Sequence, residues 1–464
     1  MQEFISSFPE IEYSPLLKGG SSGLMALRRQ YDASQWWKPD QLREAQFSRL
    51  TQLAEHALGT VPFHAERLLA AGFVSGNPMT PEIWSRLPAL SRDEVRDQAE
   101  RLHASSYPPS FGGTITASSG GSTGIPVRVL KTALDGLMWQ AAHLREFQWN
   151  DVDPSLDIAN LRGVPSFLES LKKSPHALQD AGGWIAPTWG PPASLLWKTG
   201  KMGIIEPYEP LAKQAEFLMK RRPAYLIMRP AGLRLLLSYF REQGRTLDSI
   251  RSVWTMSESV DESLRELCLE VFGCPVFSNY TCNETGYIAL QCPSGSNYHV
   301  VSESALVEVV DQEGRACQPG EIGRVLVTPL YNFAMPLLRY QVGDEAEVGS
   351  PCACGRGLPS LTRIVGRLED YVTLRSGLKR RVDIEHYKIS RIQAIREFQL
   401  VQTCLERVEL RVVASRPLEV EDQEKLEEVL KKSFEGYLDW GVVFVDSLPR
   451  TPAGKLRQFL SEVG

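Results

Sequence analysis

A glycine- and hydroxyl-rich loop at residues 118–124, SSGGSTG, has the composition of a phosphate-binding loop. Glycines let successive backbone N–H groups point at one anion, and hydroxyl groups add further donors. The residues concerned are Ser118, Ser119, Gly120, Gly121, Ser122, Thr123 and Gly124. The loop lacks the Gly-Lys-Ser/Thr of a Walker A motif, and a strand is expected after it. A mobile hairpin that closes over a nucleotide's phosphates fits this composition, and so does a flexible linker or a simple tight hairpin.

Three side chains further along could bind the rest of a nucleotide. Glu284 lies in a polar loop, NETG, after an apolar strand, where open α/β sheets bind ligands. Its carboxylate suits Mg²⁺ held against phosphates, and the ring of Tyr280 could lie on a base. The alternative is that Glu284 caps a helix and Tyr280 is core. Asp344, after Gly343, has two acceptor oxygens that suit a ribose diol, or it is simply a turn residue.

Four soft or borderline metal ligands fall in turn-rich sequence. They are Cys292 and His299 in CPSGSNYH, and Cys352 and Cys354 in CACG. A Cys₃His set makes a closed, tetrahedral zinc site of the structural type. Free thiols and a surface histidine are the alternative, because the long gap between the two pairs is not diagnostic.

A single lysine near the C-terminus is presented by a constrained loop. In LPRTPAGK, residues 448–455, Pro452 restricts the backbone and Gly454 frees it next to Lys455. Such a loop would place one cation at a defined position.

Size and composition limit the classes of protein that fit. A chain of 464 residues is expected to form two or more domains. Its net charge of −5 and the lack of a basic block argue against nucleic-acid or membrane partners. The first residues do not resemble a signal peptide, and no apolar run is long enough to span a membrane. Eight scattered cysteines are not a disulfide framework, so we expect a cytoplasmic location.

Hydrophobic periodicity predicts the elements that must position these residues. Residues 39–74 fit two helices, and Ser91 with Glu94 forms a capping box that starts another. Strands are expected on both sides of the Gly/Ser loop, at 113–117 and 127–131. From about 155 to 300 strands and helices alternate, which predicts a largely parallel sheet. The further elements expected are strands at 157–161, 224–228, 249–256 and 275–281, helices at 231–244 and 261–273, antiparallel strands within 303–349, and a small α+β unit from about 368.

The order of the motifs resembles the adenylate-forming enzymes, which include acyl- and aryl-CoA ligases, adenylation domains and luciferases. The matching segments are SSGGSTGIP, NYTCNETG, LLRYQVGD, GRLED and LPRTPAGK, which span residues 118 to 455 in the family's order. Within this superfamily the chain is most similar to the phenylacetate–coenzyme A ligase branch. That similarity is carried by LTQLAEHALGTVPFHAERLLAAGF, LPALSRDEVR, TPLYNFAMPLLRYQVGD and CACGRGLPSLTRIVGR.

The resemblance implies a fold class and a domain organisation. It implies an α/β fold with a large N-terminal adenylation domain, residues 1–366, built of mixed α/β sheets with a small barrel-like β subdomain. A small mobile α+β domain, residues 367–464, would carry the catalytic lysine.

The resemblance also implies a role for each matched residue. The loop Ser118–Gly124 would close over the β- and γ-phosphates of ATP. Ser257 and Glu258 would line the adenine pocket and Tyr280 would stack on adenine. Glu284 would bind Mg²⁺, Asp344 and Arg367 would hold the ribose, Glu369 would be the hinge, and Lys455 would reach the carboxylate and α-phosphate. Some members of the branch bind zinc through such a Cys/His set.

The chain departs from the family pattern at three positions. Val127 and Arg128 stand where many members have a lysine after the loop's proline. Asn283 replaces the usual Thr or Ser before the glutamate, which leaves its contact with the α-phosphate open. Glu369 stands where Asp or Lys is more usual.

The implied function is ATP-dependent activation of a carboxylic acid to an acyl-adenylate, followed by thioester formation with coenzyme A. The branch favours aromatic acids, and the Trp- and Phe-rich segments 138–149, 162–169 and 182–190 lie where the acyl pocket is expected, although core packing fits them equally. Two alternatives stay open: loading of a carrier protein's phosphopantetheine, as in natural-product assembly, and a non-catalytic nucleotide-binding relative. The branch also allows a homodimer.

Overall fold

The computed structural model describes residues 19–118, 127–162, 182–207, 209–256, 260–367, 394–434, 436–450, 456–457 and 459–463, with short stretches between 169 and 180 and between 371 and 392. Contacts divide the chain into two compact units. The first unit is built from residues within 1–157, 186–202 and 278–366. The second unit is built from residues within 158–185, 203–277 and 367–464.

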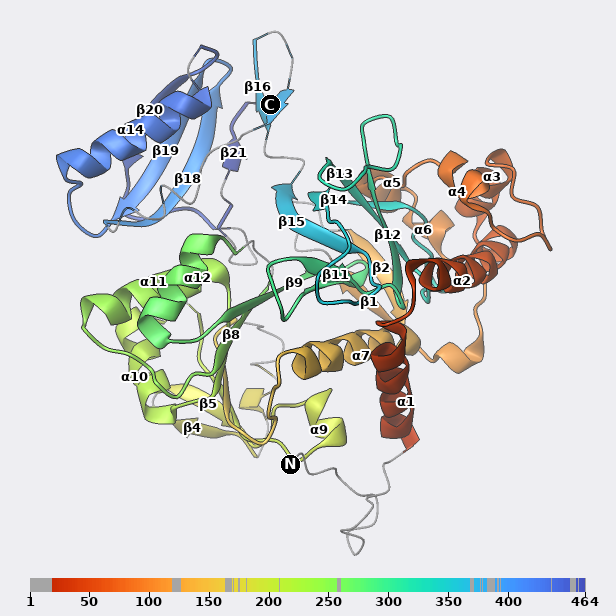
Figure 1. Cartoon of the computed structure of the whole chain (residues 1–464), viewed down its shortest axis with the longest axis horizontal. Helices are drawn as coiled ribbons and strands as arrows, with labels where there is room; N and C mark the ends of the chain where they lie inside the picture. Colours follow the sequence, from red (N-terminus) through yellow and green to blue (C-terminus); the bar gives the residue numbers. More distant parts are fainter. Residues whose placement is uncertain are drawn as a thin grey trace, which may run out of the picture. The chain divides into compact units, whose positions relative to one another are not determined.

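The first unit begins with helices that cover a β-structure. Its helices are α1 Gly19–Ser34, α2 Pro39–Thr60, α3 Pro62–Ala70, α4 Pro81–Arg86, α5 Arg92–Asp97, α6 Ala99–Leu102, the short 3₁₀ helix η1 Pro109–Phe111, α7 Ala133–Trp149 and α9 Ala193–Leu196. Helices α1 and α7 contact one another (Figure 1). The two helices predicted in 39–74 are confirmed, and extended backbone at Val61 separates them.

Two sets of antiparallel strands complete the first unit. A hairpin pairs β1 Thr114–Ser118 with β2 Arg128–Thr132. The larger set has the order β12-β13-β14-β15-β11-β10-β9. Its bounds are β9 Val276–Cys282, β10 Gly286–Gln291, β11 Tyr298–Val300, β12 Ala305–Val310, β13 Ile322–Pro329, β14 Tyr340–Val348 and β15 Ser360–Arg367. Buried side chains from β10 and β12–β15 share one core, which is consistent with the predicted barrel-like subdomain.

The second unit contains the parallel part of the predicted α/β fold. Its strands run in the order β8-β7-β3-β6-β5-β4, and β3, β7 and β8 pair in parallel. The bounds are β3 Ile158–Asn160, β4 Leu178–Asp180, β5 Gly183–Ala186, β6 Met202–Ile204, β7 Tyr225–Met228, β8 Ser252–Thr255, α10 Leu211–Arg221, α11 Pro230–Glu242 and α12 Glu262–Phe272. The predicted alternation up to residue 300 ends early, because the short loop 283–285 joins β9 to β10 as an antiparallel hairpin.

Residues after 367 form the predicted α+β structure. A hairpin pairs β16 Tyr371–Thr373 with β17 Lys379–Arg381, and a four-stranded sheet has the order β20-β19-β18-β21. Its elements are β18 Ile395–Cys404, β19 Arg407–Ala414, α14 Val420–Phe434, β20 Asp439–Phe444 and β21 Phe459–Ser461. The apolar face of α14 packs on this sheet (Figure 1). The division into domains 1–366 and 367–464 stays a prediction.

Local sequence signals explain several helix ends. Helix α5 begins with the predicted capping box, in which Ser91 N donates to the Glu94 carboxylate at 2.8 Å. Helix α12 ends at Gly273, whose φ of 67° is the left-handed conformation that glycine accepts most readily. None of the helices among the described residues is long and apolar enough to cross a membrane.

Candidate active site and metal cluster

The turn between β9 and β10 presents the predicted magnesium ligand, Glu284. A strand follows it, so the alternative that Glu284 caps a helix is wrong. The residue is only 4% exposed, and two groups hold its carboxylate. The Tyr340 hydroxyl donates to Oε1 at 3.2 Å, and Arg92 Nη1 lies 3.5 Å from the same oxygen. Burial raises the pKa of Tyr340, which keeps its hydroxyl protonated as a donor.

The predicted adenine and ribose residues meet in the structure. The Tyr280 hydroxyl donates to Asp344 Oδ2 at 2.8 Å. The Tyr280 ring is buried in the core of the first unit, so the core interpretation describes its position, while stacking on adenine stays a prediction. Asp344 lies within β14 and not in a terminal turn. Residues 342–344 face a single residue of β13, and this bulge, with φ of 89° at Gly343, redirects Asp344.

Asn283 connects this turn to the start of the Gly/Ser loop. Its Nδ2 donates to the backbone oxygen of Ser118 at 2.7 Å. The side chain that departs from the family pattern therefore contacts the loop in this structure. Five predicted residues, Ser118, Tyr280, Asn283, Glu284 and Asp344, thus converge on one region of the first unit.

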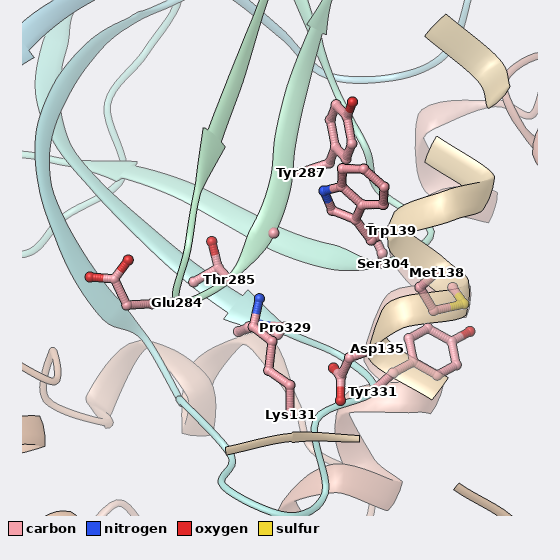
Figure 2. Close-up of a pocket in the computed structure, with 11 residues that line it drawn as sticks. Lys131, Asp135, Met138, Trp139, Glu284, Thr285, Tyr287, Ser304, Pro329 and Tyr331 are labelled. Carbon is pink, nitrogen blue, oxygen red and sulfur yellow. The ribbon is translucent and has the colours of Figure 1, made fainter. Parts of the chain in front are cut away.

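A small pocket that is open to solvent lies next to Glu284 (Figure 2). Its lining residues come from β2, α7, the β9–β10 hairpin and the strands beyond. They are Lys131, Asp135, Met138, Trp139, Glu284, Thr285, Gly286, Tyr287, Ser304, Pro329 and Tyr331. Met138 and Trp139 belong to segment 138–149, which was expected at the acyl pocket.

The pocket combines aromatic walls with charged groups at the start of α7. Asp135 Oδ2 accepts from both the backbone N and the hydroxyl of Thr132, at 2.8 Å each, which starts the helix with a capping box. Burial raises the pKa of Asp135, although these hydrogen bonds act in the opposite direction. Burial lowers the pKa of Lys131, while the nearby groups of Cys282, Asp135 and Glu284 act to raise it.

A buried carboxyl group lies behind the pocket wall. The Tyr287 hydroxyl donates to Glu146 Oε2 at 3.0 Å, and Asn279 Nδ2 donates to Oε1 at 3.0 Å. His143 Nδ1 lies 2.7 Å from the same Tyr287 hydroxyl, and its ring stacks on Trp139. Burial raises the pKa of Glu146 to about 7, although the hydrogen bonds from Asn279 and Tyr287 act to lower this pKa. The Glu146 carboxyl is therefore the group of this cluster whose charge changes near neutral pH.

The four predicted zinc ligands come together in the first unit. Their ligand atoms all lie within 4.8 Å of one another. Cys352 Sγ is 3.8 Å from Cys292 Sγ, and Cys354 Sγ is 3.2 Å from His299 Nε2. A tetrahedron with Zn–S of about 2.3 Å and Zn–N of about 2.0 Å has edges of roughly 3.5 to 3.8 Å. The side chains therefore fit a single zinc ion.

Two tight turns and one hydrogen bond orient these ligands. Gly355 N donates to Cys352 O at 3.1 Å, which folds the Cys352–Gly355 segment into a knuckle, and Ser294 N points at Cys292 Sγ from 3.4 Å. His299 Nδ1 lies 3.4 Å from the Leu358 backbone oxygen, which directs Nε2 at the sulfurs. Burial lowers the pKa of His299 to about 4, so the ring is neutral, as a metal ligand must be.

Some predicted residues lie outside the described part of the chain. These are Ser119, Gly120, Gly121, Ser122, Thr123, Gly124, Ser257, Glu258, Glu369 and Lys455, together with the side chain of Arg367. Other residues of the site were not predicted. Arg92 and Tyr340 carry no sequence signal for their contact with Glu284. The position of Asp135 does have a sequence signal, because Thr132 and Asp135 have the spacing of a capping box directly after a strand.

Comparison with known proteins shows what the whole chain is similar to. No protein-family model matches the chain. Phenylacetate–coenzyme A ligase of Thermus thermophilus is 25% identical over 410 residues, 82% of either chain. Protein CapK of Staphylococcus aureus is 24% identical over 219 residues, 46% of either chain.

Solved structures with the same fold include two CoA ligases with bound adenylates. 2-Hydroxyisobutyryl-CoA ligase in the postadenylation state gives a TM-score of 0.70 at 18% identity, over 90% of this chain and 89% of that one. An anthranilate CoA ligase in complex with anthranoyl-AMP gives 0.54 at 17% identity, over 74% of this chain and 65% of that one. The chain therefore has the fold of these CoA ligases, and its sequence is similar to that of phenylacetate–coenzyme A ligase over most of its length.

Proposed function

We propose that the chain activates a carboxylic acid with ATP to an acyl-adenylate and then transfers the acyl group to coenzyme A. The observation that carries this proposal is the convergence of Tyr280, Asn283, Glu284 and Asp344 beside one pocket in an adenylate-forming fold. The homology to phenylacetate–coenzyme A ligase supports coenzyme A as the acceptor.

In the first half-reaction the acid's carboxylate attacks the α-phosphorus of ATP and pyrophosphate leaves. Asp344, held by the Tyr280 hydroxyl, would accept hydrogen bonds from the ribose diol. Glu284 would hold a magnesium ion, which neutralises phosphate charge when bound. Arg92 and Tyr340 fix the direction in which this carboxylate points.

In the second half-reaction the thiol of coenzyme A attacks the adenylate's carbonyl carbon, and AMP leaves. Lys455, which lies outside the described residues, is proposed to serve the first half-reaction by approaching the carboxylate and the α-phosphate. The domain 367–464 would rotate about Glu369 and remove Lys455 before the thiol arrives. Lys455→Ala should then abolish pyrophosphate exchange and largely spare thioester formation from supplied acyl-adenylate. Equal loss of both half-reactions would contradict this role.

We propose an aromatic carboxylic acid as the substrate. The rings of Trp139, Tyr287 and Tyr331 line the pocket beside Glu284, and they suit a flat ring. The zinc proposed for Cys292, His299, Cys352 and Cys354 would be structural, because four protein ligands leave no open position. It would join the end of β10 and β11 to the loop before β15.

ATP–pyrophosphate exchange over a panel of aromatic and aliphatic acids tests the proposal. We expect exchange with aromatic acids, and thioester formation when coenzyme A is added. Exchange with no acid in the panel would overturn the proposal. Exchange followed by transfer only to a carrier-protein phosphopantetheine would overturn coenzyme A as the acceptor.

A further inference from the structure

The pocket beside Glu284 contains a lysine that the proposed chemistry does not use. Lys131 is the second-to-last residue of β2, and its ammonium extends into the pocket (Figure 2). A Cβ built on Gly286 would lie 4.0 Å from Lys131 Nζ and 3.9 Å from Trp139 Cδ1. The ammonium and the indole therefore approach the same point above the Gly286 backbone.

The carboxylates of the pocket already have other partners. Glu284 accepts from Tyr340 and lies beside Arg92, and Asp135 accepts twice from Thr132 in the helix cap. Among the residues that the structure describes, none forms a hydrogen bond or an ion pair with the Lys131 ammonium. A partly buried ammonium without such a partner has lost part of its hydration, so an oxygen acceptor on a ligand would bind it favourably.

The surroundings of Lys131 define the ligand chemistry that it would select. Trp139, Tyr287 and Tyr331 supply flat apolar walls, and Lys131 is the pocket's one cationic side chain among the described residues. A ligand with an unsubstituted aromatic ring would leave the ammonium without a hydrogen-bond acceptor. A site that contains an unpaired polar group binds such a ligand less well than a ligand that carries the acceptor.

We propose that Lys131 determines substrate specificity by binding a second oxygen acceptor of the acid, such as a ring hydroxyl or a second carboxylate, away from the carboxyl group that reacts. This inference rests on the proposed function, because it assigns the pocket to the acid. Under this inference the proposed substrate is an aromatic acid that carries an additional oxygen substituent, rather than an aromatic acid in general.

The test compares matched acids with and without the second acceptor. Phenylacetate is compared with 3- and 4-hydroxyphenylacetate, and benzoate with 3-hydroxybenzoate and isophthalate, by pyrophosphate exchange. We expect the wild type to prefer an acid with the second acceptor by about tenfold or more in kcat/KM. Lys131→Met should reduce this ratio to about twofold or less, and Lys131→Arg should restore part of it. Both acids of a pair are measured on one preparation, so a loss of folded protein cancels in the ratio.

Lys201→Met serves as the matched control, because Lys201 is exposed and does not line the pocket. The hydroxyl and carboxylate members of the panel show which kind of acceptor is preferred. Equal kcat/KM for both acids of every pair would overturn the inference, and so would a loss of kcat/KM in Lys131→Met that is the same for all acids. In either case, exchange by the wild type still supports the proposed function.

Calorimetric binding of the same acids, without turnover, separates the two proposals further. If the acids with the second acceptor bind more tightly to the wild type than to Lys131→Met, the inference is supported even when no pyrophosphate exchange is seen. Binding that is equal in both proteins, or absent, overturns the role of Lys131.

Discussion

Replacement of Glu146 by glutamine should stabilise the protein, and more strongly as the pH rises. The carboxyl is buried on α7, where Asn279 and Tyr287 donate to it. A glutamine keeps the size of the side chain and an acceptor oxygen. Asn279 Oδ1 in the same cluster is buried and accepts no hydrogen bond from any described residue, so an acceptor is present for a new donor. The substitution thus removes an ionisable group with little change in packing.

The magnitude follows from the raised pKa of Glu146. Burial raises this pKa from 4.5 to about 7, so the folded state holds the proton more tightly than the unfolded state does. The stability associated with that proton is therefore fully present below pH 4.5, falls as the pH rises, and is lost just above pH 7. Once the group is ionised in both states, the fold is destabilised by about 3 kcal/mol, of which about 2 kcal/mol falls between pH 5.5 and 8.5.

Urea unfolding followed by tryptophan fluorescence at pH 5.5, 7 and 8.5 measures the effect. The difference in unfolding free energy between Glu146→Gln and wild type should grow by about 2 kcal/mol over this range. Glu44→Gln is the control, because Glu44 is exposed on α2 and its replacement should leave the pH profile unchanged. A difference between Glu146→Gln and wild type that is constant with pH would refute the assignment of the titration to Glu146.

Three further changes test the site. Cys352→Ser should lower the zinc content of the purified protein well below one per chain, measured by metal analysis, and destabilise the fold by a few kcal/mol, measured by thermal unfolding. Replacement of the exposed Cys404 by serine should change neither quantity. A wild-type protein without zinc would contradict the proposed metal site. Glu284→Gln should reduce pyrophosphate exchange by about 10²-fold or more through lost magnesium binding, and exchange at the wild-type rate would remove Glu284 from the mechanism. Tyr340→Phe removes the donor to Glu284 and should raise the magnesium concentration needed for half-maximal exchange by about tenfold, whereas an unchanged magnesium dependence would show that Arg92 alone suffices.

The sequence by itself determined the features that depend on neighbouring residues. The Ser91–Glu94 capping box and the helix predicted at 261–273 are set by contacts within a few residues, and both were predicted. The order of the motifs indicated the adenylate-forming fold in the same way, because each motif is a short segment whose chemistry can be recognised without its surroundings.

The tertiary structure alone decided which groups meet across long separations in sequence. Arg92 and Tyr340 reach Glu284 from α5 and β14, and a bulge in β14 turns Asp344 toward Tyr280. The charge state of Glu146 likewise depends on burial beneath Tyr287, since a carboxyl's pKa is set by the solvent and donors around it. Such contacts and burial arise only when distant strands and helices pack together, so no local pattern of residues records them.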